Sequence, residues 1–159
     1  MDRGYARAPV GERARCTKPY HRGAQVNLIG AVDVSGIRTL MTVDDTVNGD
    51  VFVVFAERFL APTLCSGDVV VWDNLSLHKM ASIRSIIEST GAELWFLPPY
   101  SPDLNPIEEF WSKLKAEIRR FAPPTIGAFH RALRWAMSLV TRDDLRGWFK
   151  HSGYLAQCG

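Results

Sequence analysis

The part of the sequence that most constrains the fold is residues 67–111, where an apolar run and a proline-rich loop each lead to an acidic side chain. The run Val69–Trp72 is followed abruptly by Asp73. A short run of β-branched and aromatic residues bounded by polar ones is typical of a buried strand in a parallel or mixed sheet. Asp73 is therefore expected at the carboxyl end of a strand, where open α/β sheets bind their ligands.

The end of this stretch predicts the start of a helix. Asn105 is a favourable N-cap, Pro106 suits the first helical position, and Glu108 follows in the first turn. Between Asp73 and Glu108 lie 34 residues, and three prolines stiffen residues 98–102. Carboxylates from a strand end and a helix start can hold a hard divalent cation. The structural alternative for Glu108 is a capping box, with its carboxylate folded back onto the Asn105 N–H. Glu109 is a weaker ligand candidate, because it points about 100° away around the helix.

The apolar periodicity of the remaining chain predicts strands and helices in alternation. The expected elements are a hairpin from 25–34 and 37–43, helices over 51–64 and 80–89, a strand over 93–97, and helices over 106–121, 125–140 and 141–149. Phe52, Phe55, Phe59 and Leu60 are expected to face the core. This order implies an α/β sheet domain with helices packed on it. Pro123-Pro124 marks the strongest boundary, which assigns 1–122 to the main part and 123–159 to C-terminal packing helices of the same domain.

Charge is distributed unevenly along the chain. The net charge is +2, but residues 1–22 alone carry +4, with Arg3, Arg7, Arg13 and Arg15 among their cations. A basic arm attracts phosphate without reading base sequence; the alternative is a solvated terminus. Lys115 and its cationic neighbours on the 106–121 helix admit the same two interpretations, phosphate contact or a solvated face.

Composition favours a cytoplasmic protein of one domain. The 159 residues include no 18-residue apolar run, which argues against a membrane-spanning helix, and the Arg-rich start lacks the apolar segment of a secretory signal. The three cysteines are widely spaced, as in a reduced protein and not a disulfide scaffold or zinc site. His130 and His151 are expected to be isolated from any acid or Cys partner, and to be surface or cap residues and not ligands.

The motifs WDNLSLHK and FLPPYSPDLNPIEEFWSKLK, with their spacing, resemble the DDE transposases of bacterial insertion sequences in the Tc/mariner-like superfamily. The resemblance covers residues 5–154. It implies a ribonuclease-H-like mixed sheet flanked by helices, two Mg²⁺ or Mn²⁺ ions, and cleavage and strand transfer of double-stranded DNA at transposon ends. Asp73 and Glu108 would be catalytic metal ligands, and the HK pair, His78 and Lys79, would contact DNA.

The family also has a third catalytic acid, on a strand that precedes a segment like residues 3–14, RGYARAPVGERA. Because Met1 stands almost directly before this segment, the first strand and its acid are expected to be absent. Asp2 follows no apolar run, and Asp33, beside Ser35-Gly36, is better interpreted as a hairpin-turn residue. Asp44 and Asp45 are interpreted as solvated or helix-capping.

The chain is accordingly expected to be a fragment that is impaired by itself. Its reading frame could be joined to an upstream part by frameshifting, its start could be assigned too far downstream, or it could be a decayed remnant. Expected partners are an upstream helix-turn-helix polypeptide or further copies of the chain. The alternative is a non-catalytic nucleic-acid-binding remnant or interaction protein that keeps the fold.

Overall fold

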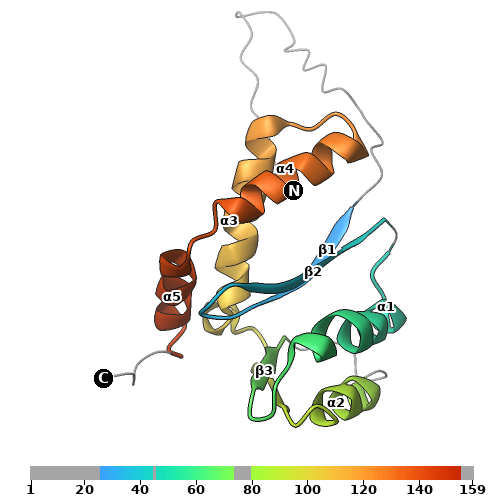
Figure 1. The fold of residues 1–159 in the computed structure, drawn as a ribbon. Helices are drawn as coiled ribbons and strands as arrows, with labels where there is room; N and C mark the ends of the chain where they lie inside the picture. The colour runs from blue at the N-terminus through green and yellow to red at the C-terminus, as the bar shows by residue number, and fades with distance from the viewer. Residues whose placement is uncertain (1–25, 45, 74–79, 155–159) are drawn as a thin grey trace, which may run out of the picture.

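The computed structural model describes residues 26–44, 46–73 and 80–154, in which strands and helices alternate (Figure 1). The strands are β1 (Asn27–Val32), β2 (Ile37–Val43), β3 (Val69–Trp72) and β4 (Glu93–Phe96). The helices are α1 (Gly49–Val54), η1 (Phe55–Leu60), η2 (Ala61–Thr63), α2 (Met80–Glu88), η4 (Pro102–Leu104), α3 (Pro106–Phe121), α4 (Ile126–Ser138) and α5 (Arg142–His151). The predicted α/β class is confirmed. No described helix is long and apolar enough to cross a membrane.

The four described strands form two separate pairs. β1 and β2 make the predicted antiparallel hairpin, with Asn27 opposite Val43 and an irregularity between Ala31 and Val32. β3 and β4 run parallel, with Val69 opposite Glu93. One continuous mixed sheet is therefore not formed by the described strands, and the ribonuclease-H-like arrangement stays a prediction. So does the division of the chain at residue 122.

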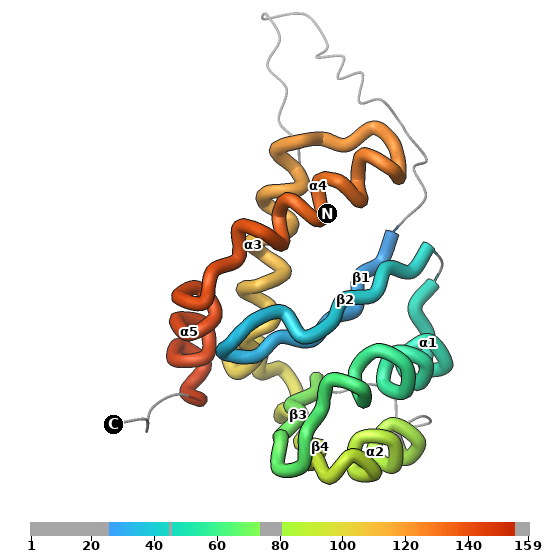
Figure 2. The backbone as a smooth tube through the Cα atoms, in the orientation of Figure 1, coloured from blue at the N-terminus to red at the C-terminus, as the bar shows by residue number. Residues whose placement is uncertain are grey.

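The hairpin is the middle layer between two groups of helices (Figure 2). Because side chains alternate across a strand, Ile29 and Leu28 point to opposite faces of β1. Ile29 packs in a cluster with Phe55 of η1 and Ile83 of α2. Leu28 packs against a second cluster, which Phe110 and Leu114 of α3 form with Leu133 and Ala136 of α4. Both faces of the hairpin are thus used to bury apolar surface.

The second sheet is covered on one face. Val70, Trp72 and Leu94 belong to the cluster that contains Ile29, so this face packs on the same helices as the hairpin. On the other face, Val69 is 46% exposed and Trp95 is 56% exposed. The prediction that Val69–Trp72 is a buried strand is therefore wrong for this face, since residues 26–44, 46–73 and 80–154 do not cover it.

The helix predicted over residues 51–64 changes its winding twice. Its N-cap is Asn48, whose side chain accepts a hydrogen bond from Val51 N at 3.1 Å. After α1 the chain widens into the π-helix η1 and then tightens into the 3₁₀ turn η2, which contains Pro62. In wider turns, residues five apart share a face, and Phe55 and Leu60 are both buried. Phe59, predicted to be in the core, is 37% exposed, because the predicted spacing assumed an uninterrupted α-helix.

α3 connects the helical layer to the hairpin and to α5. Its Phe110 and Leu114 are fully buried, and Lys113 Nζ lies 2.5 Å from Asp144 Oδ2 at the start of α5. Asp144 also completes the capping box with Thr141. On the hairpin side, the Trp111 ring lies so close to Gly30 that an added Cβ would stand 3.1 Å from Trp111 Cη2. The same Cβ would be 3.0 Å from Leu40 Cδ1 and 3.2 Å from the Thr39 carbonyl oxygen.

Gly30→Ala is therefore expected to destabilise the chain by about 1–3 kcal/mol, because side chains and backbone on three sides would have to shift. Urea unfolding followed by circular dichroism measures the change. Gly147→Ala is the matched control: Gly147 lies in α5 with no atom within 4 Å of an added Cβ, and should gain about 0.5–1 kcal/mol in helix propensity. Equal midpoints for Gly30→Ala and the unmodified chain would contradict the close packing of Trp111 on β1.

Candidate active site

Asp73 leaves β3 at its carboxyl end, as the sequence predicts, and its side chain is exposed. The residue before it, Trp72, lies opposite Phe96 in the parallel pair, and Trp72 O accepts a hydrogen bond from Leu97 N at 3.0 Å. The Trp72 ring also makes edge-on contacts with Phe52 and Phe55, with centroids 6.0 and 6.4 Å away. Asp73 therefore follows a strand end that is held by both backbone and side-chain contacts.

The chain that leads to Glu108 starts from the same edge of this sheet. β4 ends at Phe96, the partner of Trp72, and the next residue, Leu97, is buried. The proline-rich loop then includes Tyr100, whose φ of 58° is unusual for a bulky residue, and the short turn η4. A hydrogen bond of 2.7 Å from the Tyr154 hydroxyl to Leu104 O ties this loop to the C-terminal part of the chain. Burial raises the pKa of Tyr154, so the hydroxyl keeps its proton at neutral pH.

Glu108 lies in the first turn of α3, and its side chain is exposed. The predicted N-cap is confirmed, since Asn105 Oδ1 accepts from Ile107 N at 3.4 Å. The capping-box alternative is not observed, because Asn105 N donates to Pro102 O at 3.0 Å. Within the described chain, the Glu108 carboxylate has no hydrogen bond or ion pair. It therefore remains available for a ligand, next to the positive end of the helix dipole.

Glu109 is in a different environment from Glu108. His151 Nε2 lies 3.7 Å from Glu109 Oε1, so His151 has an acidic neighbour. The expectation that His151 is isolated from acids is wrong, because α5 packs beside α3. Substitution of Glu109 is therefore a suitable control for substitution of Glu108.

The carboxylates of Asp73 and Glu108 have the donor chemistry that Mg²⁺ and Mn²⁺ prefer. Over residues 26–44, 46–73 and 80–154, no group of three or more His, Cys, Asp or Glu side chains could hold a metal ion. The two predicted ligands therefore fit a hard cation in kind, but no third described donor joins them in a cluster.

Asp33 is a turn residue, as predicted, and not a third acid of this site. Asp33 Oδ1 accepts hydrogen bonds from Ser35 N at 2.7 Å, from Ser35 Oγ at 2.7 Å and from Gly36 N at 2.9 Å. Its other oxygen pairs with Arg38 Nε on the neighbouring strand. Burial opposes ionisation of Asp33 and is the largest single effect on its pKa. The hydrogen bonds from Ser35, Arg38 and Gly36 together outweigh it and lower the pKa below 3.8.

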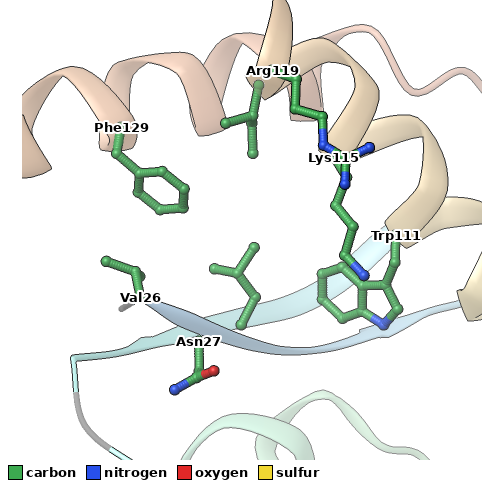
Figure 3. Close-up of a pocket in the computed structure, with 8 residues that line it drawn as sticks. Val26, Asn27, Trp111, Lys115, Arg119 and Phe129 are labelled. Carbon is green, nitrogen blue, oxygen red and sulfur yellow. The ribbon is translucent and has the colours of Figure 1, made fainter. Parts of the chain in front are cut away.

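Most of the predicted DNA-contacting residues lie outside the described chain: Arg3, Arg7, Arg13, Arg15, His78 and Lys79. Lys115 is described, and its side chain is exposed on α3. It lines a pocket of about 370 Å³ together with Arg119, Trp111 and Phe129 (Figure 3). The sequence predicted phosphate contact or a solvated face for the cations of α3, but it did not predict that Lys115 and Arg119 line one pocket. The spacing of Trp111, Lys115 and Arg119, four residues apart, is the signal that could have placed them on one face.

Comparison with known proteins assigns the chain to a class. The sequence profile of the DDE superfamily endonucleases matches residues 1–126. The chain therefore belongs to the DDE superfamily endonuclease family.

One curated relative also matches part of the chain. The chain is 26% identical over 122 residues to the transposable element Tc1 transposase of Caenorhabditis elegans. The match covers 72% of this chain and 45% of the relative, so the chain spans less than half the length of that transposase. The predicted resemblance to DDE transposases is confirmed at the level of the family.

The lowered pKa of Asp33 makes the stability of the fold depend on pH. Since the folded state lowers this pKa, the ionised carboxylate stabilises the fold above pH 3.8, and this stabilisation is lost as the pH falls through the lowered value. Asp33→Asn is expected to cost about 1 kcal/mol at pH 7 and progressively less toward pH 3. Urea midpoints at both pH values test this. A midpoint at pH 7 that is unchanged by Asp33→Asn would exclude the turn role.

Proposed function

We propose that this chain is the catalytic part of a DDE transposase, in which Asp73 and Glu108 hold the divalent metal ions. The observation that carries the proposal is the parallel pairing of β3 with β4. Because Trp72 lies opposite Phe96, Asp73 and the loop that leads to Glu108 both begin at the same edge of one sheet. The exposed Glu108 carboxylate, which the helix cap does not use, supports the same role.

In the proposed reaction, water or a freed 3′-hydroxyl attacks a DNA phosphodiester in line. When bound, Mg²⁺ or Mn²⁺ would supply the charge that activates the attacking oxygen and stabilises the leaving one. The protein's own task is positioning, which phosphoryl transfer requires more than covalent participation. Strand β3 would hold Asp73 in position, while the proline loop and the first turn of α3 would hold Glu108.

The proposed substrate is double-stranded DNA at transposon ends, as in mobile elements of the bacterial insertion-sequence type. Support comes from the family match and from the transposase name of the relative. Lys115, and the predicted contacts Arg3, Arg7, Arg13, Arg15, His78 and Lys79, would bind phosphates of this DNA.

We further propose that the chain is impaired by itself. Among the described residues no group of three His, Cys, Asp or Glu side chains could hold a metal ion, whereas the family uses three acids, and the described strands form two pairs in place of one sheet. An upstream polypeptide that adds a strand ending in an acid would complete both features, and β-strand addition is a common mode of assembly. A second copy of the chain is the other proposed partner.

The alternative function is non-catalytic binding of nucleic acid. Two observations favour it: the described residues contain no group of three side chains that could hold a metal ion, and they form a pocket on α3 that is lined by two cations. Salt-sensitive DNA binding that is unaffected by EDTA and by Asp73→Ala, without cleavage in any combination of partners, would support this alternative.

Metal binding tests the proposed site directly. Mn²⁺ titration followed by electron paramagnetic resonance is expected to show at least tenfold weaker binding after Asp73→Asn or Glu108→Gln, because each change removes a charged ligand. Glu109→Gln is the matched control and should leave Mn²⁺ affinity within about twofold, since its carboxylate points elsewhere on the helix. If all three variants bound Mn²⁺ as tightly as the unmodified chain, the proposed metal site at Asp73 and Glu108 would be excluded.

Cleavage tests the proposed impairment. A duplex carrying the transposon end is expected to remain intact with the chain and Mn²⁺ alone. It should be nicked when the polypeptide encoded directly upstream is added, and Asp73→Ala should abolish the restored cleavage. Robust turnover by the chain alone, abolished by Asp73→Ala, would refute impairment while confirming the role of Asp73.

A further inference from the structure

The pocket on α3 has a floor and walls that are mostly apolar. β1 and the residue before it contribute Val26, Asn27 and Leu28, α3 contributes Trp111, Lys115, Ile118 and Arg119, and α4 contributes Phe129. Trp111 and Phe129 line the pocket from different elements, with Lys115 beside the Trp111 ring and Arg119 above them (Figure 3). The volume of about 370 Å³ is in the range of small-ligand sites.

The cations of α3 differ in how they are neutralised. Lys113 pairs with Asp144, and Arg120 pairs with Glu117 at 3.1 Å. Lys115 and Arg119, the two that line the pocket, have no ion pair with any residue that the structure describes. They stand four residues apart, and like charges at this spacing destabilise an isolated helix. An anion between them would remove this repulsion.

Charge also indicates which occupant suits the pocket. The chain's own residues 1–22 carry +4 and would be repelled by Lys115 and Arg119. The complementary ligand combines an anionic group with a planar, largely apolar ring, because the pocket combines two cations with two aromatic rings. A nucleotide has both parts, and bases stack on aromatic side chains with little dependence on sequence.

We propose that this pocket binds one unpaired nucleotide of a DNA strand. Its phosphate lies between Lys115 and Arg119, and its base packs against Trp111 and Phe129. A base within a duplex is already stacked and does not reach such a pocket, so the preferred DNA has a single-stranded end. The inference rests on the proposed function for its choice of DNA. Lys115 lies about 10 Å along α3 from Glu108. The pocket is therefore separate from the proposed metal ligand on this helix.

The test measures binding of the full chain to fluorescent oligonucleotides in EDTA, by anisotropy at several salt concentrations. A single strand and a duplex with a 3′ overhang are expected to bind at least tenfold more tightly than a blunt duplex of equal length. In Lys115→Gln/Arg119→Gln, the slope of log affinity for the single strand against log salt should fall by about 0.7, the value for one lost phosphate contact.

Two further variants make the result specific. Arg142→Gln/Arg146→Gln removes the same charge from exposed positions of α5 and should leave the slope and the preference for single strands unchanged. Phe129→Leu keeps an apolar side chain but removes the ring, and should weaken single-strand binding about tenfold with the salt slope unchanged. Thermal unfolding of each variant shows that the fold is retained.

Equal loss of affinity in the two charge variants would overturn the proposal, because it would show attraction by net charge alone. Tighter binding of blunt duplex than of single strand would overturn it as well. These outcomes are independent of the proposed catalytic role. If Mn²⁺ binding does not depend on Asp73 and Glu108 while the preference for single strands holds, only the catalytic proposal is excluded. If Mn²⁺ binding depends on both residues while the preference for single strands is absent, only the nucleotide pocket is excluded.

Discussion

The parallel pairing of β3 with β4 is the constraint on which the candidate site depends. Two short strands, separated by α2, end side by side with Trp72 opposite Phe96. Both candidate ligands follow from this shared edge. Asp73 comes directly after β3, and a stiff loop connects the end of β4 to Glu108. Among the residues that the structure describes, helices support the pairing from one side, where Trp72 contacts Phe52 and Phe55. Loss of this aromatic contact would release the strand end that presents Asp73.

α3 unites the functions proposed for the chain. Its first turn presents Glu108, its buried side carries Phe110 and Leu114, and its outer side lines the pocket with Lys115. Because α3 packs on the hairpin and on α4, these elements set the position of Glu108 as well as that of the pocket. The close approach of Trp111 to Gly30 shows how tightly this helix is seated.

Much of the fold could be predicted from local patterns. The hairpin, the cap at Asn105 and the turn role of Asp33 depend on neighbours a few residues away, and all three are confirmed. The errors arose where distant contacts decide. Phe59 is exposed because the helix widens at η1, and His151 meets Glu109 because α5 packs beside α3. One face of β3 is uncovered within the described chain, which no alternation of apolar residues could reveal.

The sequence by itself determined the family and suggested Asp73 and Glu108 as the candidate site, since their spacing and the motifs around them are local properties of the chain. Only the tertiary structure decided that Glu108 stays out of the helix cap, that Tyr154 holds the proline loop through Leu104, and that Lys115 and Arg119 share a pocket with Phe129. The reason is physical: a cap competes with alternative hydrogen-bond partners, and a pocket requires side chains from elements that meet only after packing.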